Sequence, residues 1–288
     1  MCVLTGCARQ PEPPEISINA KSAVIIDARK NTVLYSKDPD KRFPPASTAK
    51  VMTAVVAAEN APLSRTMRPG EGIADVEPTV AGLKPGVEYR LKDLIAAILI
   101  QSANDAAIVI AEGIAGSEAD FAALMNNKAR EIGMEDTYFA NASGLPTGVK
   151  DSQYTTANDL ARLMQYAKRK KIIVTMISKK EMDIRGGDGE KIELKTHNKV
   201  LLQKKDAPWG KTGYTREAKR TFVGMDPSSK PHIVFALLQS NELWSDIIKL
   251  NINGLEAYHE SRRTIFSDIM DWVKSSRERG REAVLGVA

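Results

Sequence analysis

The sequence predicts a mixed α/β (α+β) fold in which both ends of the chain form an antiparallel sheet and the middle forms a helical insert. Three observations lead to this prediction. Short β-branched runs lie near the N-terminus, between residues 22 and 36. From residue 62 to about residue 199, apolar residues recur mainly at helical spacing. Apolar or alternating runs then return between residues 211 and 239, so the sheet is expected to resume there.

The first elements predicted are two strands and a buried helix. The runs 22–28 (SAVIIDA) and 32–36 (TVLYS) are separated by Arg29-Lys30-Asn31, a pattern typical of a hairpin. Pro44-Pro45 then stops regular structure. A buried helix is expected over residues 47–58, where apolar side chains follow a helical period.

Helices are expected through the middle of the chain and again at its end. The clearest of the middle helices cover residues 91–101, 103–115, 118–132 and 156–168. Strands follow over 211–215, 220–225 and 232–239, with a turn at 226–229. A long terminal helix places Ile265, Phe266, Ile269, Met270 and Val273 on one face, with Arg262, Lys274, Arg277 and Arg281 elsewhere. That face is expected to pack on the sheet, with contact to a membrane surface as the alternative.

These elements predict three parts of the chain. Residues 1–18 form a tether, residues 19–60 and 200–288 form a sheet subdomain with terminal helices, and residues 61–199 form a helical subdomain. About 50 residues follow the last predicted strand, so we expect no further β-rich domain at the C-terminal end of the sequence.

The composition excludes several classes of protein. The chain has 288 residues, of which 43% are hydrophobic and 27% charged, which is ordinary globular usage and argues against disordered, collagen-like or mucin-like proteins. No run approaches the ~20 apolar residues of a membrane span. The net charge of +5 gathers in short lysine-rich runs, at 168–171 and 204–205. Only 6% of the residues in the chain are aromatic, and no known nucleic-acid-binding motif accompanies these runs. The runs therefore indicate solvated surface, and we expect no nucleic-acid partner.

Both cysteines lie at the N-terminus, so neither a disulfide nor a cysteine-based metal site is expected in the body of the fold. The sequence Leu4-Thr5-Gly6-Cys7 resembles the end of a bacterial lipoprotein signal, which makes Cys7 a candidate for lipidation. A full signal would carry an apolar stretch of ~7–15 residues before this site. Either the natural start lies upstream of residue 1, or the match is accidental. The proline-containing residues 8–15 are expected to form an extended tether.

A nucleophile and a base are suggested by Ser47-Thr48-Ala49-Lys50. A serine and a lysine at positions i and i+3 are neighbours on one helix face. Ser47 would lie in the first turn, where the helix dipole favours developing negative charge. Burial disfavours the charged form of a lysine, so Lys50 among apolar residues can accept the serine proton. The alternative is an ordinary serine cap followed by a lysine on the helix face.

Two further groups of residues complete a candidate site. Ser102 and Asn104 lie at the break between two apolar helical segments, where both side chains can point into a cleft; the alternative is a plain helix cap. Lys211-Thr212-Gly213 opens a predicted strand. Lys211 offers a positive charge and Thr212 a hydroxyl for a carboxylate, and Gly213 allows close approach of a substrate backbone.

Together, in order and context, these groups resemble the Ser-x-x-Lys, Ser-x-Asn and Lys-Thr-Gly motifs of the penicillin-binding proteins and serine β-lactamases. The flanking sequences PPASTAKVMTA, QSANDAA, FANASGLP, YTTANDLARLM and GKTGYT narrow the resemblance to the D-alanyl-D-alanine carboxypeptidases, the low-molecular-weight penicillin-binding proteins. The resemblance runs from about residue 20 to 250. It implies an antiparallel sheet flanked by helices, an inserted helical subdomain, and an active site in the groove between them.

The resemblance also implies a mechanism. Ser47 would attack the penultimate D-alanine carbonyl of a peptidoglycan stem peptide ending in D-Ala-D-Ala, with Lys50 as general base. Ser102 would relay a proton to the leaving amine, and Asn104 would orient Lys50 and the substrate. The backbone N–H groups of Ser47 and Tyr214 would form the oxyanion hole. Residues that would hold the substrate carboxylate or line the same strand are Lys211, Thr212, Gly213 and Thr215.

The same resemblance sets the expected partners, cofactors and location. Penicillins and other β-lactams should acylate Ser47, and no metal or other cofactor is implied. None of His197, His232 and His259 lies in a zinc-ligand pattern or a catalytic-triad motif. An extracytoplasmic location is expected, in the periplasm or at the outer face of the cell membrane, with attachment through Cys7 as an option.

Three rival functions stay open. A D,D-endopeptidase that cleaves cross-links would use the same residues. A β-lactamase or related esterase would need a glutamate that activates the deacylating water. Glu131 and Glu135 are the glutamates in the stretch from Ala119 to Leu145, but neither lies in a matching context, so slow deacylation of β-lactams is expected. The rival of another class is a non-catalytic, wall-binding or penicillin-sensing lipoprotein.

Overall fold

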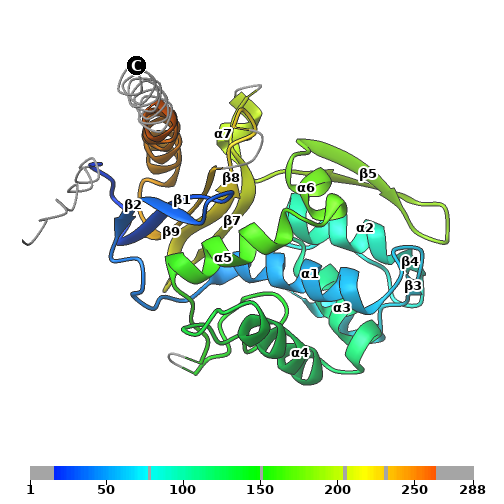
Figure 1. The fold of residues 1–288 in the computed structure, drawn as a ribbon. Helices are drawn as coiled ribbons and strands as arrows, with labels where there is room; N and C mark the ends of the chain where they lie inside the picture. Colours follow the sequence, from blue (N-terminus) through cyan, green and yellow to red (C-terminus); the bar gives the residue numbers. More distant parts are fainter. Residues whose placement is uncertain (1–15, 77–78, 150–151, 204–205, 230–232, 264–288) are drawn as a thin grey trace, which may run out of the picture.

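The centre of the structure is a five-stranded antiparallel sheet with the strand order β2-β1-β9-β8-β7 (Figure 1). The computed structural model describes residues 16–76, 79–149, 152–203, 206–229 and 233–263. The strands are β1 (Ser22–Asp27), β2 (Thr32–Lys37), β7 (Trp209–Thr215), β8 (Lys219–Met225) and β9 (Ile233–Ser240). Strand β1 pairs with β9, so the sheet joins the two ends of the chain, as the sequence predicts.

The two faces of the sheet carry separate hydrophobic clusters because side chains alternate along each strand. On β9, Val234 and Ala236 belong to the larger cluster, shared with the helices of the middle of the chain. Phe235 and Leu237 belong to the other cluster, which includes apolar side chains of a helix over residues 243–263. The described part of this helix therefore packs on the sheet, whereas the packing of the apolar face predicted for residues 265–273 stays a prediction. The apolar residues 265–273 and the basic residues 274–281 lie outside the described residues.

The predicted helices of the middle of the chain are confirmed with small shifts at their ends. The α-helices are α1 (Lys50–Asn60), α2 (Leu91–Ala96), α3 (Asn104–Ala115), α4 (Glu118–Glu131), α5 (Ala157–Ala167), α6 (Lys171–Ile177) and α7 (Lys199–Gln203). Short 3₁₀ segments cover η1 (Ala46–Ala49) and η2 (Glu71–Asp75), and a π-helical segment, η3 (Ala97–Gln101), continues α2.

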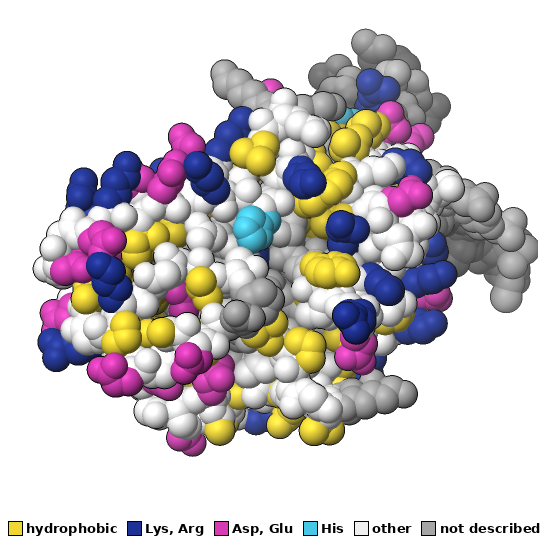
Figure 2. Space-filling model, turned by 180° about the vertical axis from the view of Figure 1, so that it is seen from behind, with side chains coloured by type: hydrophobic (Ala, Val, Ile, Leu, Met, Phe, Trp, Pro, Cys, Tyr) yellow, Lys and Arg dark blue, Asp and Glu magenta, His cyan; other side chains and the backbone are white. Residues whose placement is uncertain are grey.

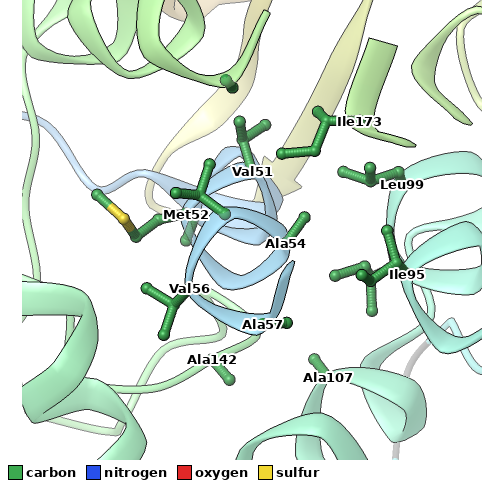
Figure 3. Packing of buried hydrophobic residues seen from close by; sticks show 14 of the residues in the cluster. Val51, Met52, Ala54, Val56, Ala57, Ile95, Leu99, Ala107, Ala142 and Ile173 are labelled. Carbon is green, nitrogen blue, oxygen red and sulfur yellow. The ribbon is translucent and has the colours of Figure 1, made fainter. Parts of the chain in front are cut away.

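Helix α1 is the centre of the larger cluster. Its residues from Lys50 to Ala57 are all buried, so apolar side chains surround this helix on every side. Figure 3 shows Ala54 and Ala57 of α1 on the side of the helix toward Ile95 of α2 and Ala107 of α3, with Val51 and Met52 on its other sides. A helix held from all sides is a rigid base for the side chains at its first turn.

The sequence did not predict the strands within the insert. The hairpin of β5 (Glu181–Arg185) and β6 (Lys191–Lys195) extends at one end of the molecule, and β3 (Thr66–Met67) pairs with β4 (Tyr89–Arg90) (Figure 1). The expectation of a helical pattern with irregular loops was therefore wrong over 181–195. Its sequences, EMDIR and KIELK, alternate apolar and charged residues with the period of a strand. The charged positions hid this period because one face of the hairpin is exposed.

The division into a sheet subdomain and a helical subdomain stays a prediction. Helix α5 belongs to the predicted insert by sequence but lies against β1, β8 and β9. None of the helices in the described part of the chain has the length and apolar character needed to cross a membrane.

Figure 2 shows one face of the molecule, on which Lys and Arg side chains lie toward the left and the right with acidic side chains among them.

Candidate active site

Ser47 lies in η1, the 3₁₀ turn that leads into α1. Two hydroxyl groups fix this turn by donating to the carbonyl of Pro45, from Thr48 at 2.6 Å and from Thr221 of β8 at 3.2 Å. Ala46, directly before Ser47, has a φ of 47°, which is a strained conformation for a residue with a side chain. The Ser47 side chain itself is half-buried, so it stays accessible to a ligand.

Lys50 is the hub of the candidate site. Its ammonium nitrogen Nζ donates to Ser47 Oγ at 3.0 Å, to Asn104 Oδ1 at 2.7 Å and to the carbonyl oxygen of Ser143 at 2.7 Å. The side chain is fully buried at the start of α1. The acceptors on Asn104 and Ser143 therefore hold the Lys50 nitrogen within hydrogen-bonding distance of the Ser47 hydroxyl.

Burial makes Lys50 a base. Desolvation lowers the pKa of Lys50 well below its ordinary value, because water no longer stabilises the positive charge, and the charge of Lys211 lowers it further. The carboxylates of Asp105 and Glu118 act in the opposite direction and raise it. A lowered pKa increases the fraction of lysine in the neutral form, which is the form that can accept the proton of Ser47.

Ser102 and Asn104 are positioned by a break between two helices, as the sequence predicts. The π-helical turn η3 ends at Ser102, which has a φ of 66° in the left-handed region. Helix α3 then begins at Asn104. π-Helical turns and strained residues are frequent at functional sites. Asp105 accepts hydrogen bonds from the backbone N–H groups of residues 81–83, which ties the neighbouring loop to the start of α3.

Lys211 enters the site from β7, which lies at one edge of the sheet. Its Nζ donates to Ser102 Oγ at 2.9 Å and to the carbonyl of Thr212 at 2.6 Å, and its side chain is 2% exposed. Burial lowers the pKa of Lys211 to about 7. Ser102 thus lies beside a second buried lysine, which connects the helical side of the site to the sheet.

The remaining predicted residues of β7 have different surroundings. A Cβ atom at Gly213 would lie 2.8 Å from the backbone nitrogen of Ser47, so β7 passes directly beside the nucleophile. Tyr214 is 64% exposed, and the guanidinium of Arg220 lies 5.6 Å from its ring. The Thr215 hydroxyl accepts the N–H of Ala218 and thus belongs to the β7–β8 turn. Cys7 lies outside the described residues.

The segment 134–156 supplies the carbonyl of Ser143, which the sequence did not single out. Asn141 Oδ1 accepts hydrogen bonds from the backbone N–H groups of Ser143 at 3.2 Å and Gly144 at 2.7 Å, which shapes the turn that carries this carbonyl. A Cβ atom at Gly144 would lie 2.0 Å from the Ala46 carbonyl oxygen, so only glycine allows this close packing.

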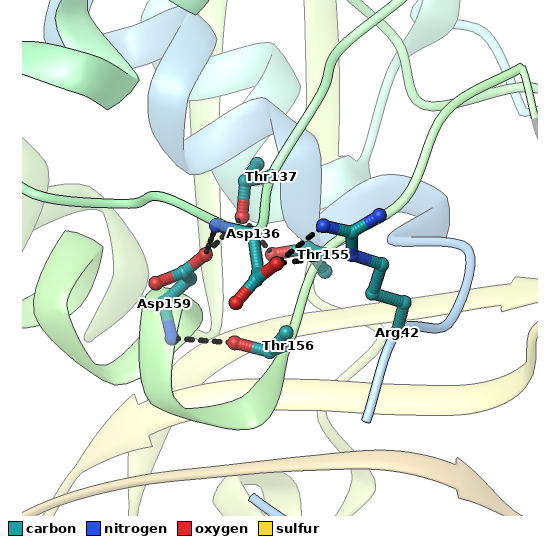
Figure 4. Close-up of polar contacts among 6 residues, drawn as sticks. All are labelled: Arg42, Asp136, Thr137, Thr155, Thr156 and Asp159. Atoms are coloured by element: carbon teal, nitrogen blue, oxygen red, sulfur yellow. Dashed lines mark hydrogen bonds and ion pairs between the residues drawn. The ribbon is translucent and has the colours of Figure 1, made fainter. Parts of the chain in front are cut away.

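Both ends of the segment 134–156 are anchored beside α5 (Figure 4). The carboxylate of Asp159 accepts the backbone N–H of Asp136 at 3.0 Å and the hydroxyl of Thr137 at 2.8 Å. The Thr137 hydroxyl also lies 2.8 Å from that of Thr155, and Arg42 pairs with Asp136. These contacts hold the base of the segment, so the Ser143 turn rests on a fixed frame.

Sequence reasoning missed two titratable residues near the lysines. Partial burial lowers the pKa of His197, and the charges of Lys211 and Lys50 lower it further. Glu118 opens α4 and interacts with Lys50 through its charge. It lies one residue before the stretch from Ala119 to Leu145, and the packing of α4 on α1 brings it close to Lys50. Glu131 and Glu135, the glutamates that the sequence offered, are exposed.

Comparison with known proteins identifies the family. Residues 7–241 match the family described as D-alanyl-D-alanine carboxypeptidase, which is most of the chain. The chain belongs to this family. The predicted family resemblance is therefore confirmed.

The curated relatives of this family member are named either D-alanyl-D-alanine carboxypeptidases or D-alanyl-D-alanine endopeptidases. The D-alanyl-D-alanine carboxypeptidase DacF of Bacillus subtilis is 33% identical over 71% of this chain, which spans only 53% of that relative's length. A D-alanyl-D-alanine carboxypeptidase of Mycobacterium tuberculosis is 31% identical, with 76% of this chain and 74% of the relative covered. A D-alanyl-D-alanine endopeptidase of Escherichia coli is 30% identical, over 76% of this chain and 70% of the relative.

Solved structures confirm the predicted fold of this family member. The crystal structure of a D-alanyl-D-alanine carboxypeptidase from Mycobacterium tuberculosis is 27% identical and has a TM-score of 0.79, covering 85% of this chain and 95% of that one. A variant of a DD-transpeptidase from Streptomyces, 24% identical, has a TM-score of 0.77, over 84% of this chain and all of that one, and bears on the fold alone.

Proposed function

We propose that this protein is a serine D,D-carboxypeptidase that removes the terminal D-alanine from peptidoglycan stem peptides through an acyl-enzyme on Ser47. One observation carries the proposal. The Nζ atom of Lys50 lies 3.0 Å from Ser47 Oγ and is fully buried, which gives a nucleophile and a base within hydrogen-bond reach. The match to the D-alanyl-D-alanine carboxypeptidase family supports the choice of substrate.

In the acylation step, Ser47 Oγ forms a bond to the penultimate D-alanine carbonyl carbon and its proton passes to Lys50 Nζ. The oxyanion that forms would accept hydrogen bonds from the backbone N–H groups of Ser47 and Tyr214. The carbon–nitrogen bond then breaks, and the leaving amine of the terminal D-alanine takes the proton that Lys50 had accepted. Ser102, hydrogen-bonded to Lys211, would relay that proton. Asn104 would keep Lys50 and the substrate amide in place.

In the deacylation step, water adds to the acyl carbonyl carbon, the bond to Ser47 Oγ breaks, and the serine regains a proton. The products are a shortened stem peptide and free D-alanine. A β-lactam would acylate Ser47 in the same way, but its amine stays tethered to the acyl group through the opened ring. Glu131 and Glu135 are exposed, so neither supports rapid hydrolysis of a β-lactam adduct.

The strand β7 would hold the substrate. Lys211 and the hydroxyl of Thr212 would bind the terminal carboxylate, since a buried lysine has a strong preference for an opposite charge. Gly213 would let the substrate backbone lie against the strand beside Ser47. Thr215 would act through the β7–β8 turn, because its hydroxyl accepts from Ala218.

The test is the intact mass of the protein after incubation with benzylpenicillin, followed over hours. The parent should gain the mass of one penicillin. Ser47→Ala should gain none, because the attacking oxygen is gone, whereas Ser178→Ala, a change away from the site, should behave like the parent. Penicillin bound covalently to Ser47→Ala would contradict the proposal. Release of D-alanine from a D-Ala-D-Ala peptide by the parent alone would complete it.

A D,D-endopeptidase is the second candidate. Endopeptidases from Escherichia coli and Haemophilus influenzae are 30% and 32% identical to this chain, and the chain covers about 70% of each. Cleavage of cross-linked muropeptide dimers in preference to monomeric pentapeptides would favour this function.

We propose an extracytoplasmic location, because peptidoglycan lies outside the cytoplasmic membrane. Attachment through a lipid on Cys7 stays a prediction of the sequence. Metabolic labelling with a fatty-acid analogue, compared between the parent and Cys7→Ala, would test it.

A further inference from the structure

Glu118 is a carboxylate beside the candidate site that the proposed reaction does not use. It lies in the first turn of α4, directly after the cap residue Ser117. Its Oε1 atom is fully buried and has no hydrogen-bond partner in the described part of the chain. A buried oxygen without a partner costs free energy, so its retention at this position calls for a compensating interaction.

Glu118 and Lys50 contact two consecutive residues of one backbone segment. The backbone N–H of Ala142 donates a hydrogen bond to the Glu118 carboxylate. The next residue, Ser143, uses its carbonyl to accept from Lys50 Nζ at 2.7 Å. The carbonyl of Ala142 accepts from Thr53 of α1 at 2.6 Å. The carboxylate therefore helps to hold the backbone that holds the lysine.

The charges around Glu118 come from three elements. The positive charge of Lys50 on α1 and the negative charge of Glu112 on α3 both act on it. On its own helix, Asp120 accepts from the Ser117 hydroxyl at 2.7 Å. Burial raises the pKa of Glu118, while the Ala142 N–H and the charge of Lys50 lower it. The other carboxylate that acts on Lys50, Asp105, already accepts four backbone N–H groups.

We propose that Glu118 is a positioning residue for Lys50 that steadies the Ala142–Ser143 backbone against the ammonium group and stabilises the protonated lysine by its charge. The inference rests on the proposed function, in which Lys50 must lose its proton before it can accept that of Ser47. Glu118 thereby sets the pH at which acylation begins, and the free Oε1 leaves its charge available to Lys50.

The test is the rate of acylation by a fluorescent penicillin, measured by stopped flow as a function of pH. Glu118→Gln keeps the size of the side chain and an acceptor for Ala142 but removes the charge. Without that charge, Lys50 loses its proton more easily. The acidic limb of the pH–rate profile, where the acylation rate rises with pH, should therefore move to lower pH by about half a unit to one unit. The maximum rate should stay within about threefold of the parent, because the acceptor is kept.

Glu131→Gln is the matched control. Glu131 lies at the other end of the same helix and is exposed, so the acidic limb of the Glu131→Gln variant should coincide with that of the parent. Glu118→Ala removes the charge and the acceptor together. It should show the same shift of the limb and a maximum rate lowered about tenfold, because the Ser143 carbonyl is no longer held in place.

The shift of the limb separates this role from a purely structural one, which would change the rate without moving the limb. If Glu118→Gln does not fold, the limb of Glu118→Ala decides the matter, since both variants lack the charge. Acidic limbs that coincide with the parent in the folded variants would overturn the inference and leave the proposed function intact. Failure of the parent to acylate would overturn both.

Discussion

At the scale of single residues, the candidate site is built on two buried lysines with lowered pKa values. Lys50 is hydrogen-bonded to Ser47, and Lys211 to Ser102. Burial is the main cause of both shifts, and the charge of Lys211 adds to that of Lys50. Because the charge of Lys211 acts on Lys50, the pH dependence of acylation should report this coupling.

Lys211→Gln tests that coupling. Removal of a neighbouring positive charge raises the pKa of Lys50, so the acidic limb of penicillin acylation should move to higher pH. The maximum rate should fall by about tenfold or more, because the penicillin carboxylate loses its charged partner. Stopped-flow rates across pH measure both effects, with the exposed Lys199→Gln as control. A limb that stays in place or moves to lower pH would show that Lys211 does not influence Lys50.

At the scale of elements, β7 must lie directly against η1 for the site to form. Gly213→Ala tests this contact, because a Cβ atom there would meet Thr221 Oγ1 at 2.4 Å and Ser47 N at 2.8 Å. The strand would be pushed away from the nucleophile, and acylation should slow by about ten- to a hundredfold. Penicillin acylation rates and thermal midpoints are compared with those of Gly72→Ala, where the added methyl group meets nothing within 4 Å. Unchanged acylation in Gly213→Ala would mean that the strand can shift without cost to the site.

At the scale of the whole molecule, Glu59 connects helices that are far apart in the sequence. This residue near the end of α1 pairs with Lys128 of α4 at 2.8 Å and Lys170 at 2.6 Å, and accepts from Tyr166 of α5 at 2.6 Å. Burial raises the pKa of Glu59, but these hydrogen bonds outweigh it and lower the pKa from 4.5 to about 2. A carboxylate whose pKa is lower in the folded state stabilises the fold above its unfolded pKa, and this contribution disappears as the pH falls toward 2.

Glu59→Gln should therefore flatten the pH dependence of stability. We expect the parent to lose about 1–2 kcal/mol in free energy of unfolding between pH 5 and pH 3 through this group, after allowance for solvent screening. The variant should be less stable than the parent at pH 7 and should lose less on acidification. Urea unfolding at pH 7, 5 and 3 measures this, with the exposed Glu193→Gln as control. Parallel profiles of Glu59→Gln and the parent would contradict the prediction.

The sequence alone predicted what neighbouring residues determine. The spacing of Ser47 and Lys50 placed them within one turn, the apolar period around Val51 predicted a buried α1, and β-branched runs predicted the strands of the sheet. The break at Ser102 was also predicted, although its left-handed backbone was not. These features depend on the backbone geometry of a few consecutive residues, which the local sequence sets.

Only the tertiary structure decided which distant groups meet. Lys211 reaches Ser102 across 109 positions of the chain, and the Ser143 carbonyl reaches Lys50 across 93. The proximity of Glu118 to Lys50 likewise arises from the packing of α4 against α1. Such contacts follow from how buried surfaces fit together over the whole core, and no period or spacing in a single sequence records them. The same packing removes water from Lys50 and Lys211, and that desolvation gives both lysines their lowered pKa values.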